Sequence, residues 1–271
     1  MYKIFDIHTH TYPELLSERA TENLGKFYNF NVECKGTVDD LMKNSRDAGI
    51  SGFLILGVAT NARQVKRVNE AIASDVALAR QNGFHAYGFA GMHQDTTDFA
   101  EEIENAVSLG LCGVKLHPDI QGADIDDARF LPLYAELERR NLPLYLHMGD
   151  DRAEYRFSEP KKLVRILDKF PNLTVFAAHF GGYKAWDDAE TYLSDCKNVY
   201  FDTSSALWAM TPDHARRLID AFGVNKIMFG TDYPLLPSSD YLELFMKLEL
   251  TEAERHAILW QNAADFFGIN E

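Results

Sequence analysis

The sequence predicts an α/β protein folded as a (β/α)8 barrel, the TIM-barrel fold, on three observations. Short apolar runs alternate with longer amphipathic segments along the whole chain. Eight strand–helix units of this kind favour a parallel barrel over an open, doubly wound sheet. The length of 271 residues suits one barrel better than two smaller domains. We therefore expect residues 1–271 to form a single barrel domain.

The expected strands are short, and several are apolar throughout, which is typical of parallel strands covered on both faces. Residues 53–56 read Phe-Leu-Ile-Leu, and residues 142–146 read Leu-Pro-Leu-Tyr-Leu. No Gly-x-Gly-x-x-Gly motif follows the first strand, so a dinucleotide-binding fold has no support. In chain order the strands are expected at residues 2–7, 52–58, 85–90, 113–116, 142–147, 174–178, 199–202 and 226–229.

Between these strands lie segments with helical periodicity. Pro160 and Pro212 stand where two of them begin, and Gly49 and Gly110 stand where two others end. Residues 11–36 form the longest stretch between the first strand and its helix, and we expect a loop insertion over the active site there. The helices are expected at residues 37–48, 62–81, 99–109, 131–140, 159–170 and 212–222.

Composition and charge restrict the partners. Apolar residues make up 46% of the chain and charged residues 25%, as in an ordinary globular protein, and the net charge is −14. An acidic surface repels nucleic acid and anionic lipid, so neither is expected as a partner. The three cysteines are far apart, no signal peptide is evident, and no apolar run approaches the roughly 20 residues that span a bilayer. We expect a cytoplasmic protein that acts on a small molecule, with a homodimer as the commonest assembly.

Histidines gather at the ends of the expected strands. His8 and His10 end the first strand, His117 follows the fourth, His147 ends the fifth and His179 follows the sixth. Barrel active sites are assembled from the carboxyl ends of strands, so these side chains should share one pocket. Side chains two positions apart on a strand project to the same face, so both imidazoles of the His-x-His pair can bind one metal ion. An isolated His-x-His pair is more often a chance feature than a metal site. Because further histidines end later strands, we favour metal ligands here.

Asp232 is the expected acidic partner of these histidines. It follows the eighth strand in the run Phe229-Gly-Thr-Asp-Tyr-Pro234, where Gly230 allows the backbone to approach the pocket closely. A carboxylate in this place can ligate a metal and take a proton from bound water. An aspartate beside a proline is by itself more typical of a turn or a helix cap. Together with the histidines, however, it indicates a metal site.

The chain resembles the amidohydrolase superfamily, because its motifs occur in the order typical of that superfamily. Within it, the chain is similar to the amidohydrolase-2 branch of metal-dependent hydrolases related to aminocarboxymuconate semialdehyde decarboxylase. The resemblance covers essentially the whole chain. It implies that one divalent metal ion, usually zinc, is bound by His8, His10, His147 and Asp232. It also implies that His179 contacts the substrate or moves protons. The motifs that carry it are Phe5-Asp-Ile-His-Thr-His10, Gly113-Val-Lys-Leu-His-Pro118, Leu146-His147, Ala178-His-Phe-Gly-Gly182, Phe229-Gly-Thr-Asp-Tyr-Pro234 and Asn262-Ala-Ala-Asp-Phe-Phe-Gly268.

Three further residues are candidates for substrate binding, each with an alternative. Lys115 could contact an anionic substrate group, form a salt bridge, or be carboxylated to bridge two metal ions, as in other members of the superfamily. His117 could line the pocket or only cap a helix. Trp208 could form an apolar wall for the substrate or belong to ordinary packing. Arg152, in the polar loop after His147, could hold a substrate carboxylate, although a solvated loop is the simpler interpretation.

The expected reaction is hydrolysis of a small-molecule amide, lactam, lactone or ester. A bound divalent metal lowers the pKa of water to about 7, and Asp232 would act as the general base. The alternative is a non-oxidative decarboxylase acting on a carboxylated aromatic or diene acid, which needs the same ligands. Hydrolysis is favoured because no loop feature marks a site for the departing carboxylate. A catalytically inactive barrel is not favoured, since every ligand position holds a competent residue.

Overall fold

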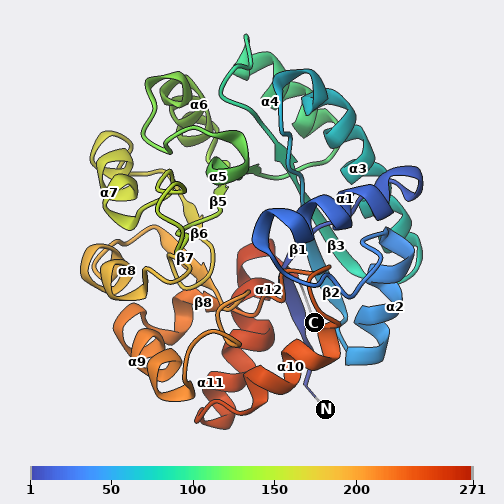
Figure 1. Ribbon diagram of the computed structural model, residues 1–271, viewed down its shortest axis with the longest axis vertical. Coiled ribbons are helices and arrows are strands. Elements are labelled where there is room, and N and C mark those ends of the chain that lie inside the picture. Colours follow the sequence, from blue (N-terminus) through green and yellow to red (C-terminus); the bar gives the residue numbers. More distant parts are fainter. Residues whose placement is uncertain (1, 270–271) are drawn as a thin grey trace.

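The computed structural model describes residues 2–269, and its eight parallel strands run in sequence order around a barrel (Figure 1). The predicted fold class is confirmed. All eight expected strands are present, and most are shorter than expected by one to three residues at their ends. They are β1 (Phe5–Thr9), β2 (Gly52–Leu56), β3 (His85–Gly91), β4 (Val114–Leu116), β5 (Leu144–Leu146), β6 (Val175–Ala177), β7 (Val199–Asp202) and β8 (Ile227–Met228).

The barrel closes where its first and last strands meet. The backbone N–H of Ile7 donates to the carbonyl of Phe229 over 2.8 Å. Beyond the end of β8, Thr9 forms a parallel bridge with Tyr233, and the N–H of Asp232 donates to the carbonyl of His8 over 2.9 Å. This seam places the backbone of Asp232 directly beside that of His8.

A ring of helices covers the outside of the barrel (Figure 1). Local sequence fixes where they begin, because Thr37, Asp98 and Thr211 each accept a backbone N–H at a helix N-cap. No helix within residues 2–269 is both long and apolar enough to cross a membrane. The helices of the ring are α2 (Val38–Ala48), α3 (Val65–Gln81), α4 (Phe99–Ser108), α6 (Leu131–Arg140), α7 (Pro160–Lys169), α8 (Trp186–Leu193), α9 (Pro212–Phe222) and α10 (Ser238–Met246).

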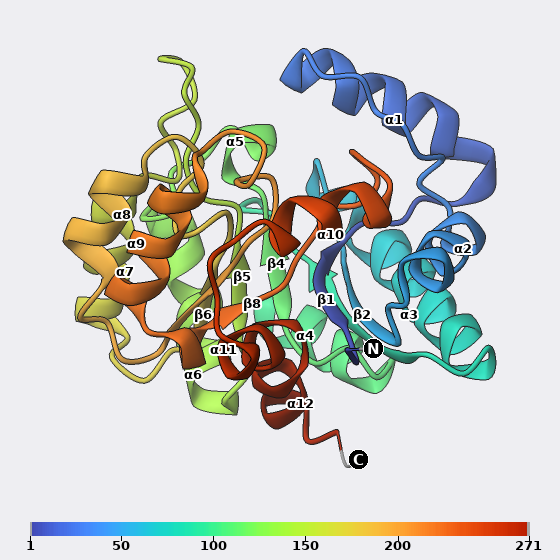
Figure 2. The same cartoon turned by 90° about the horizontal axis from the view of Figure 1, so that it is seen from below.

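Apolar packing fills the barrel and closes one of its ends. The rings of Tyr145 and Phe176, on neighbouring strands, stack inside the barrel with centroids 5.2 Å apart. The same cluster includes Trp260 and Ala264, near or within the short helix α12 (Asn262–Phe267). The remaining short helices are α5 (Pro118–Gln121) and α11 (Glu252–His256). Because α12 closes the end at which the strands begin, a functional site is left to the other end (Figure 2).

The segment of residues 11–36, expected to be a loop, contains the helix α1 (Glu14–Tyr28). Figure 2 shows α1 at the end of the barrel opposite α12. Its only fully buried residue is Ser17, and Leu15 and Leu16 are 97% and 56% exposed. The helix therefore has no apolar stripe packed on the core, which is why helical periodicity was weak in this part of the sequence.

Candidate metal centre

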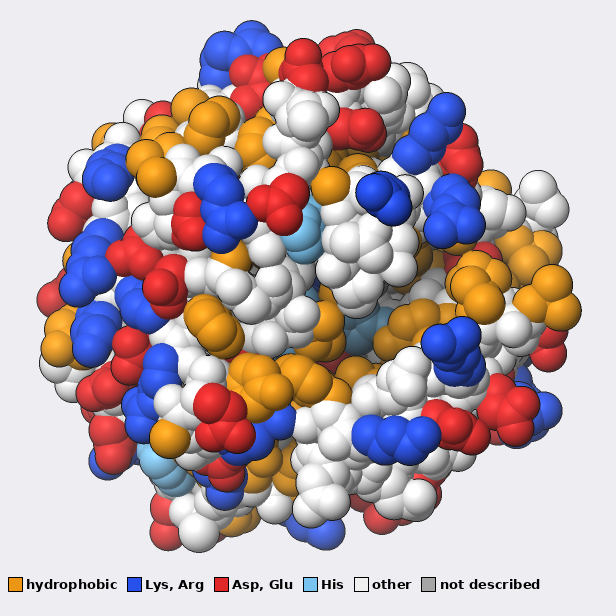
Figure 3. Space-filling model, turned by 45° about the horizontal axis from the view of Figure 1, so that its top comes forward, with side chains coloured by type: hydrophobic (Ala, Val, Ile, Leu, Met, Phe, Trp, Pro, Cys, Tyr) orange, Lys and Arg blue, Asp and Glu red, His pale blue; other side chains and the backbone are white. Residues whose placement is uncertain are grey.

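Three side chains converge at the seam between β1 and β8. The Nε2 atoms of His8 and His10 lie 3.2 Å apart. Asp232 Oδ1 lies 3.3 Å from the first and 3.5 Å from the second. His8 is almost completely buried, and only a small part of His10 and Asp232 is exposed. Histidine side chains are visible inside a hollow of the surface in Figure 3.

The hydrogen positions on these imidazoles follow from their outer contacts. His8 Nδ1 lies 2.8 Å from the carboxylate of Asp202, and His10 Nδ1 lies 2.9 Å from the carbonyl of Leu56. Both oxygens can only accept, so each imidazole carries its hydrogen on Nδ1 and exposes a bare lone pair on Nε2. Two lone pairs and a carboxylate oxygen thus face one another without a hydrogen between them.

Such an arrangement is repulsive unless a cation lies among the three atoms. Two ligand atoms bound about 2.1 Å from a tetrahedral ion are roughly 3.4 Å apart. The separations of 3.2, 3.3 and 3.5 Å among His8, His10 and Asp232 match that spacing. These residues therefore fit a divalent metal ion, and they form a candidate metal centre.

Asp202, at the end of β7, is an organising residue that the sequence analysis missed. One of its oxygens accepts the backbone N–H groups of His179, over 2.9 Å, and of Ser204, over 2.8 Å. The other faces His8 Nδ1 and accepts the hydroxyl of Tyr145. Burial alone would raise the pKa of Asp202, but His8, His179 and the hydroxyl of Ser204 hold it well below its usual value. A carboxylate behind a metal-ligating histidine fixes its tautomer and orientation.

We expect Asp202→Asn to lower metal affinity by about 10- to 100-fold. The amide oxygen must stay where two backbone N–H groups donate, so the amide NH2 would face His8 Nδ1. The hydrogen of His8 would then move to Nε2 and block the metal-facing lone pair. Competition with a chromogenic chelator measures the effect. Asp75→Asn, outside the cluster, is the control, and an unchanged affinity in Asp202→Asn would contradict this role.

His147, the fourth predicted ligand, lies beside the three converging residues but does not join their cluster. It belongs instead to a buried group with His117 and Asp119. Its Nδ1 lies 3.0 Å from His179 Nε2, and its Nε2 lies 3.4 Å from Asp119 Oδ2. His179 in turn has its Nδ1 2.9 Å from the Ser204 carbonyl and its ring stacked on His8, with centroids 5.3 Å apart. His179 thus connects His147 to the metal cluster.

Lys115 is fully buried beside the cluster. Its Nζ lies 3.5 Å from His8 Nε2 and 4.7 Å from the centre of the Tyr145 ring. Burial lowers the pKa of this amine to about 8. Within residues 2–269, no carboxylate oxygen lies within 4.0 Å of it, so of the alternatives for Lys115 the salt bridge is not formed. Asp232 and Asp202 are near enough to favour its charged form, but neither forms a direct ion pair with it.

The two other substrate-binding candidates have identifiable contacts. The Nδ1 of His117 accepts the Ile120 N–H at the start of α5, and its Nε2 faces Tyr28 at the end of α1. His117 is thus both a helix cap and part of the buried histidine group. Trp208 stacks on Phe30, with ring centroids 5.4 Å apart, so it packs against the chain that follows α1.

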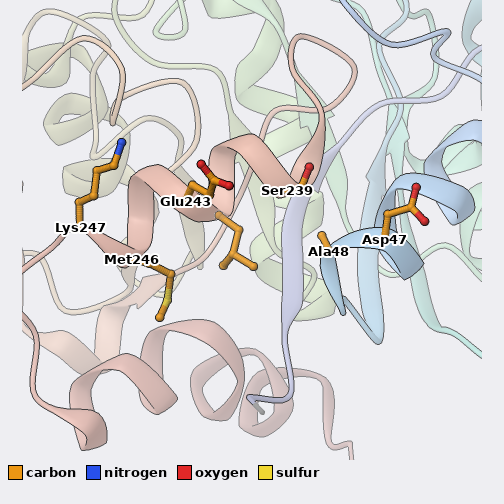
Figure 4. Close-up of a pocket in the computed structure, with 7 residues that line it drawn as sticks. Asp47, Ala48, Ser239, Glu243, Met246 and Lys247 are labelled. Atoms are coloured by element: carbon orange, nitrogen blue, oxygen red, sulfur yellow. The ribbon is translucent and has the colours of Figure 1, made fainter.

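A second hollow, between α2 and α10, lies apart from the histidines (Figure 4). It is open, and it contains neither a histidine nor any residue of the metal cluster. Its lining residues are Asp47, Ala48, Ser239, Leu242, Glu243, Met246 and Lys247. The chemistry of the site therefore belongs to the strand ends.

The barrel and its strand-end cluster are those of the amidohydrolase superfamily. The family model described as Amidohydrolase matches residues 5–269, so the chain belongs to this family. It is 26% identical, over 254 residues and 76% of both chains, to gamma-resorcylate decarboxylase from Rhodococcus jostii (strain RHA1).

Two solved structures share the fold. One is an uncharacterized TIM-barrel protein from Bordetella bronchiseptica, with a TM-score of 0.79, 22% identity and 98% coverage of both chains. The other is a dihydroxybenzoic acid decarboxylase from Polaromonas sp. JS666 with bound manganese and the inhibitor 2-nitroresorcinol. Its TM-score is 0.69 and its identity 18%, and the match covers 100% of this chain and 98% of that chain.

These comparisons correct the predicted reaction. The prediction of a hydrolase of an amide, lactam, lactone or ester is wrong, because two gamma-resorcylate decarboxylases and a third decarboxylase match 76% to 78% of the chain, and solved decarboxylases share its fold. A TatD exonuclease also matches 73% of the chain. The decarboxylases favour the alternative of a non-oxidative decarboxylase. Zinc as the particular metal also gains no support, since the similar Polaromonas structure holds manganese.

Proposed function

We propose that this protein is a metal-dependent, non-oxidative decarboxylase that acts on a carboxylated, hydroxylated aromatic acid. The observation that carries the proposal is the convergence of two bare imidazole nitrogens and a carboxylate oxygen at the strand ends. The similarity to gamma-resorcylate decarboxylase over three quarters of the chain supports the choice of reaction and substrate class.

The metal ligands that we propose are His8, His10 and Asp232, with His147 as the fourth, beside them. Manganese is the first candidate and zinc the second, with one ion per chain. When bound, the ion would orient the oxygens of the substrate and neutralise negative charge. Lys115, a buried amine that forms no direct salt bridge with the described residues, would bind an anionic group of the same substrate.

The reaction breaks the bond between the ring carbon and the carboxylate and leaves its electron pair on the ring carbon, which takes a proton as carbon dioxide departs. We assign the proton transfer to Asp232, which can take a proton from the substrate's hydroxyl group and pass it to that carbon. Ser205 donates to Asp232 Oδ2 over 2.5 Å and so orients the carboxylate. His179 would contact the substrate and stabilise its developing charge.

The experiment is a direct measurement of carbon dioxide release. Protein loaded with manganese or zinc is incubated with hydroxylated benzoic acids that carry a labelled carboxyl group, and with a panel of lactones and amides. We expect labelled carbon dioxide from at least one acid, and none after chelation of the metal. Hydrolysis of a lactone or amide without decarboxylation of any acid would overturn the proposal.

A further inference from the structure

Helix α1 brings a side chain into the buried histidine group. Tyr28, the last residue of α1, has its hydroxyl oxygen 2.7 Å from His117 Nε2. Its ring centroid lies 6.2 Å from those of both His117 and His147. These two imidazoles stack on each other, with centroids 4.0 Å apart and ring planes 13° from parallel. Tyr28 is therefore a neighbour of a proposed metal ligand, although it comes from outside the barrel.

The direction of the Tyr28–His117 hydrogen bond follows from the helix cap. His117 Nδ1 accepts the backbone N–H of Ile120, over 3.4 Å, and a nitrogen that accepts carries no hydrogen. The ring is thus neutral, with its hydrogen on Nε2, and it donates to the oxygen of Tyr28. The phenolic hydrogen of Tyr28 then has no acceptor within residues 2–269. Burial holds the pKa of Tyr28 well above its usual value, so the hydroxyl keeps that hydrogen.

Arg152 fixes the end of α1 above the site. Its guanidinium donates to the carbonyl of Phe27 over 2.5 Å, which satisfies one of the carbonyls that a helix end leaves without a partner. The same group lies 3.9 Å from the centre of the Tyr155 ring and is held by both oxygens of Asp150. Arg152 therefore binds the protein itself, and it determines where the neighbouring Tyr28 lies.

We propose that Tyr28 donates its phenolic hydrogen to an oxygen of the bound aromatic acid, so that α1 supplies a residue that determines substrate specificity. Both the carboxylate and the ring hydroxyl of such an acid accept hydrogen bonds. A ligand without an oxygen at this position leaves this partly buried O–H unpaired, which a site can use to reject the ligand. This inference rests on the proposed function for the class of its ligand.

The test is binding of 2-nitroresorcinol, an unreactive analogue, to the manganese-loaded protein by titration calorimetry. Tyr28→Phe removes only the hydroxyl group, and we expect it to weaken binding by about tenfold or more. Metal content should be unchanged. Tyr192→Phe, on the outer face of α8 with 43% of the side chain exposed, is the matched control and should bind as the wild type does.

Two further measurements identify the ligand oxygen that Tyr28 contacts and test whether Arg152 positions Tyr28. Nitrobenzene lacks the ring hydroxyls. If Tyr28→Phe loses affinity for 2-nitroresorcinol but not for nitrobenzene, Tyr28 contacts a ring hydroxyl. If the variant loses affinity equally for both ligands, Tyr28 contacts the group in the carboxylate position. Arg152→Lys keeps the charge but not the planar contacts, and should weaken binding by displacing Tyr28. If the wild type binds and decarboxylates while Tyr28→Phe binds equally well, this inference alone fails. If the wild type neither binds nor decarboxylates, the proposed function fails with it.

Discussion

Protein carrying both His8→Ala and His10→Ala is expected to lose its metal, and all metal-dependent activity with it. The wild type should contain about one equivalent of divalent metal after purification without chelator. The double change removes both bare imidazole nitrogens and leaves a single carboxylate oxygen at the seam. Elemental analysis of the two proteins, side by side, measures the difference.

The matched control is the double change His214→Ala and His256→Ala, since both of these histidines lie on outer helices. Full metal content in the His8 and His10 double variant would contradict the ligand assignment. Two equivalents in the wild type would instead favour Lys115 as a carboxylated bridge, because its Nζ already lies 3.5 Å from His8 Nε2.

The second large effect is expected from Asp232→Asn. The amide keeps one oxygen that can ligate, but it cannot carry the proton, so turnover should fall by more than about 100-fold. Metal content should fall only modestly. Rates of carbon dioxide release and metal stoichiometry, measured on the same preparation, separate the two roles of this carboxylate.

His179→Asn is the comparison that makes the Asp232 result decisive. The Nε2 of His179 lies 3.0 Å from His147 Nδ1, and His179 is not one of the three converging ligands. Its replacement should therefore leave the metal in place and still lower turnover. If His179→Asn loses the metal while Asp232→Asn remains active, the two residues have the opposite roles and the proposed mechanism is wrong.

The sequence was sufficient to predict those residues of the site for which the local spacing and the geometry of a barrel indicate the same position. The spacing of His8 and His10 on one strand and the position of Asp232 after the last were sufficient to predict that they converge. Asp202 was missed because an aspartate at the end of an apolar strand has no local feature that distinguishes it. The one available signal was the position of Asp202 at the carboxyl end of a strand. It ends β7, just as His147 follows β5 and His179 follows β6.

The helix α1 and the reaction could not be derived from local pattern. The exposed Leu15 and Leu16 gave residues 11–36 no apolar stripe, and Tyr28 is held by contacts to residues distant in sequence, His117 and Arg152. Hydrolysis and decarboxylation require the same ligand types. The choice between them depends on which substrate the surrounding loops hold, and those loops follow no simple sequence code.

The seam between β1 and β8 also has a consequence for the synthesis and folding of the protein. His8 leaves the ribosome before Asp232, which follows only after seven further strands have been synthesised. Until then the two histidines have no carboxylate across the seam, and the nascent chain lacks the complete cation-binding set. A metal ion that requires all of these ligands would therefore be bound late in biogenesis. Because only the closed barrel presents all the proposed ligands, an ion bound there would oppose separation of the first strand from the last.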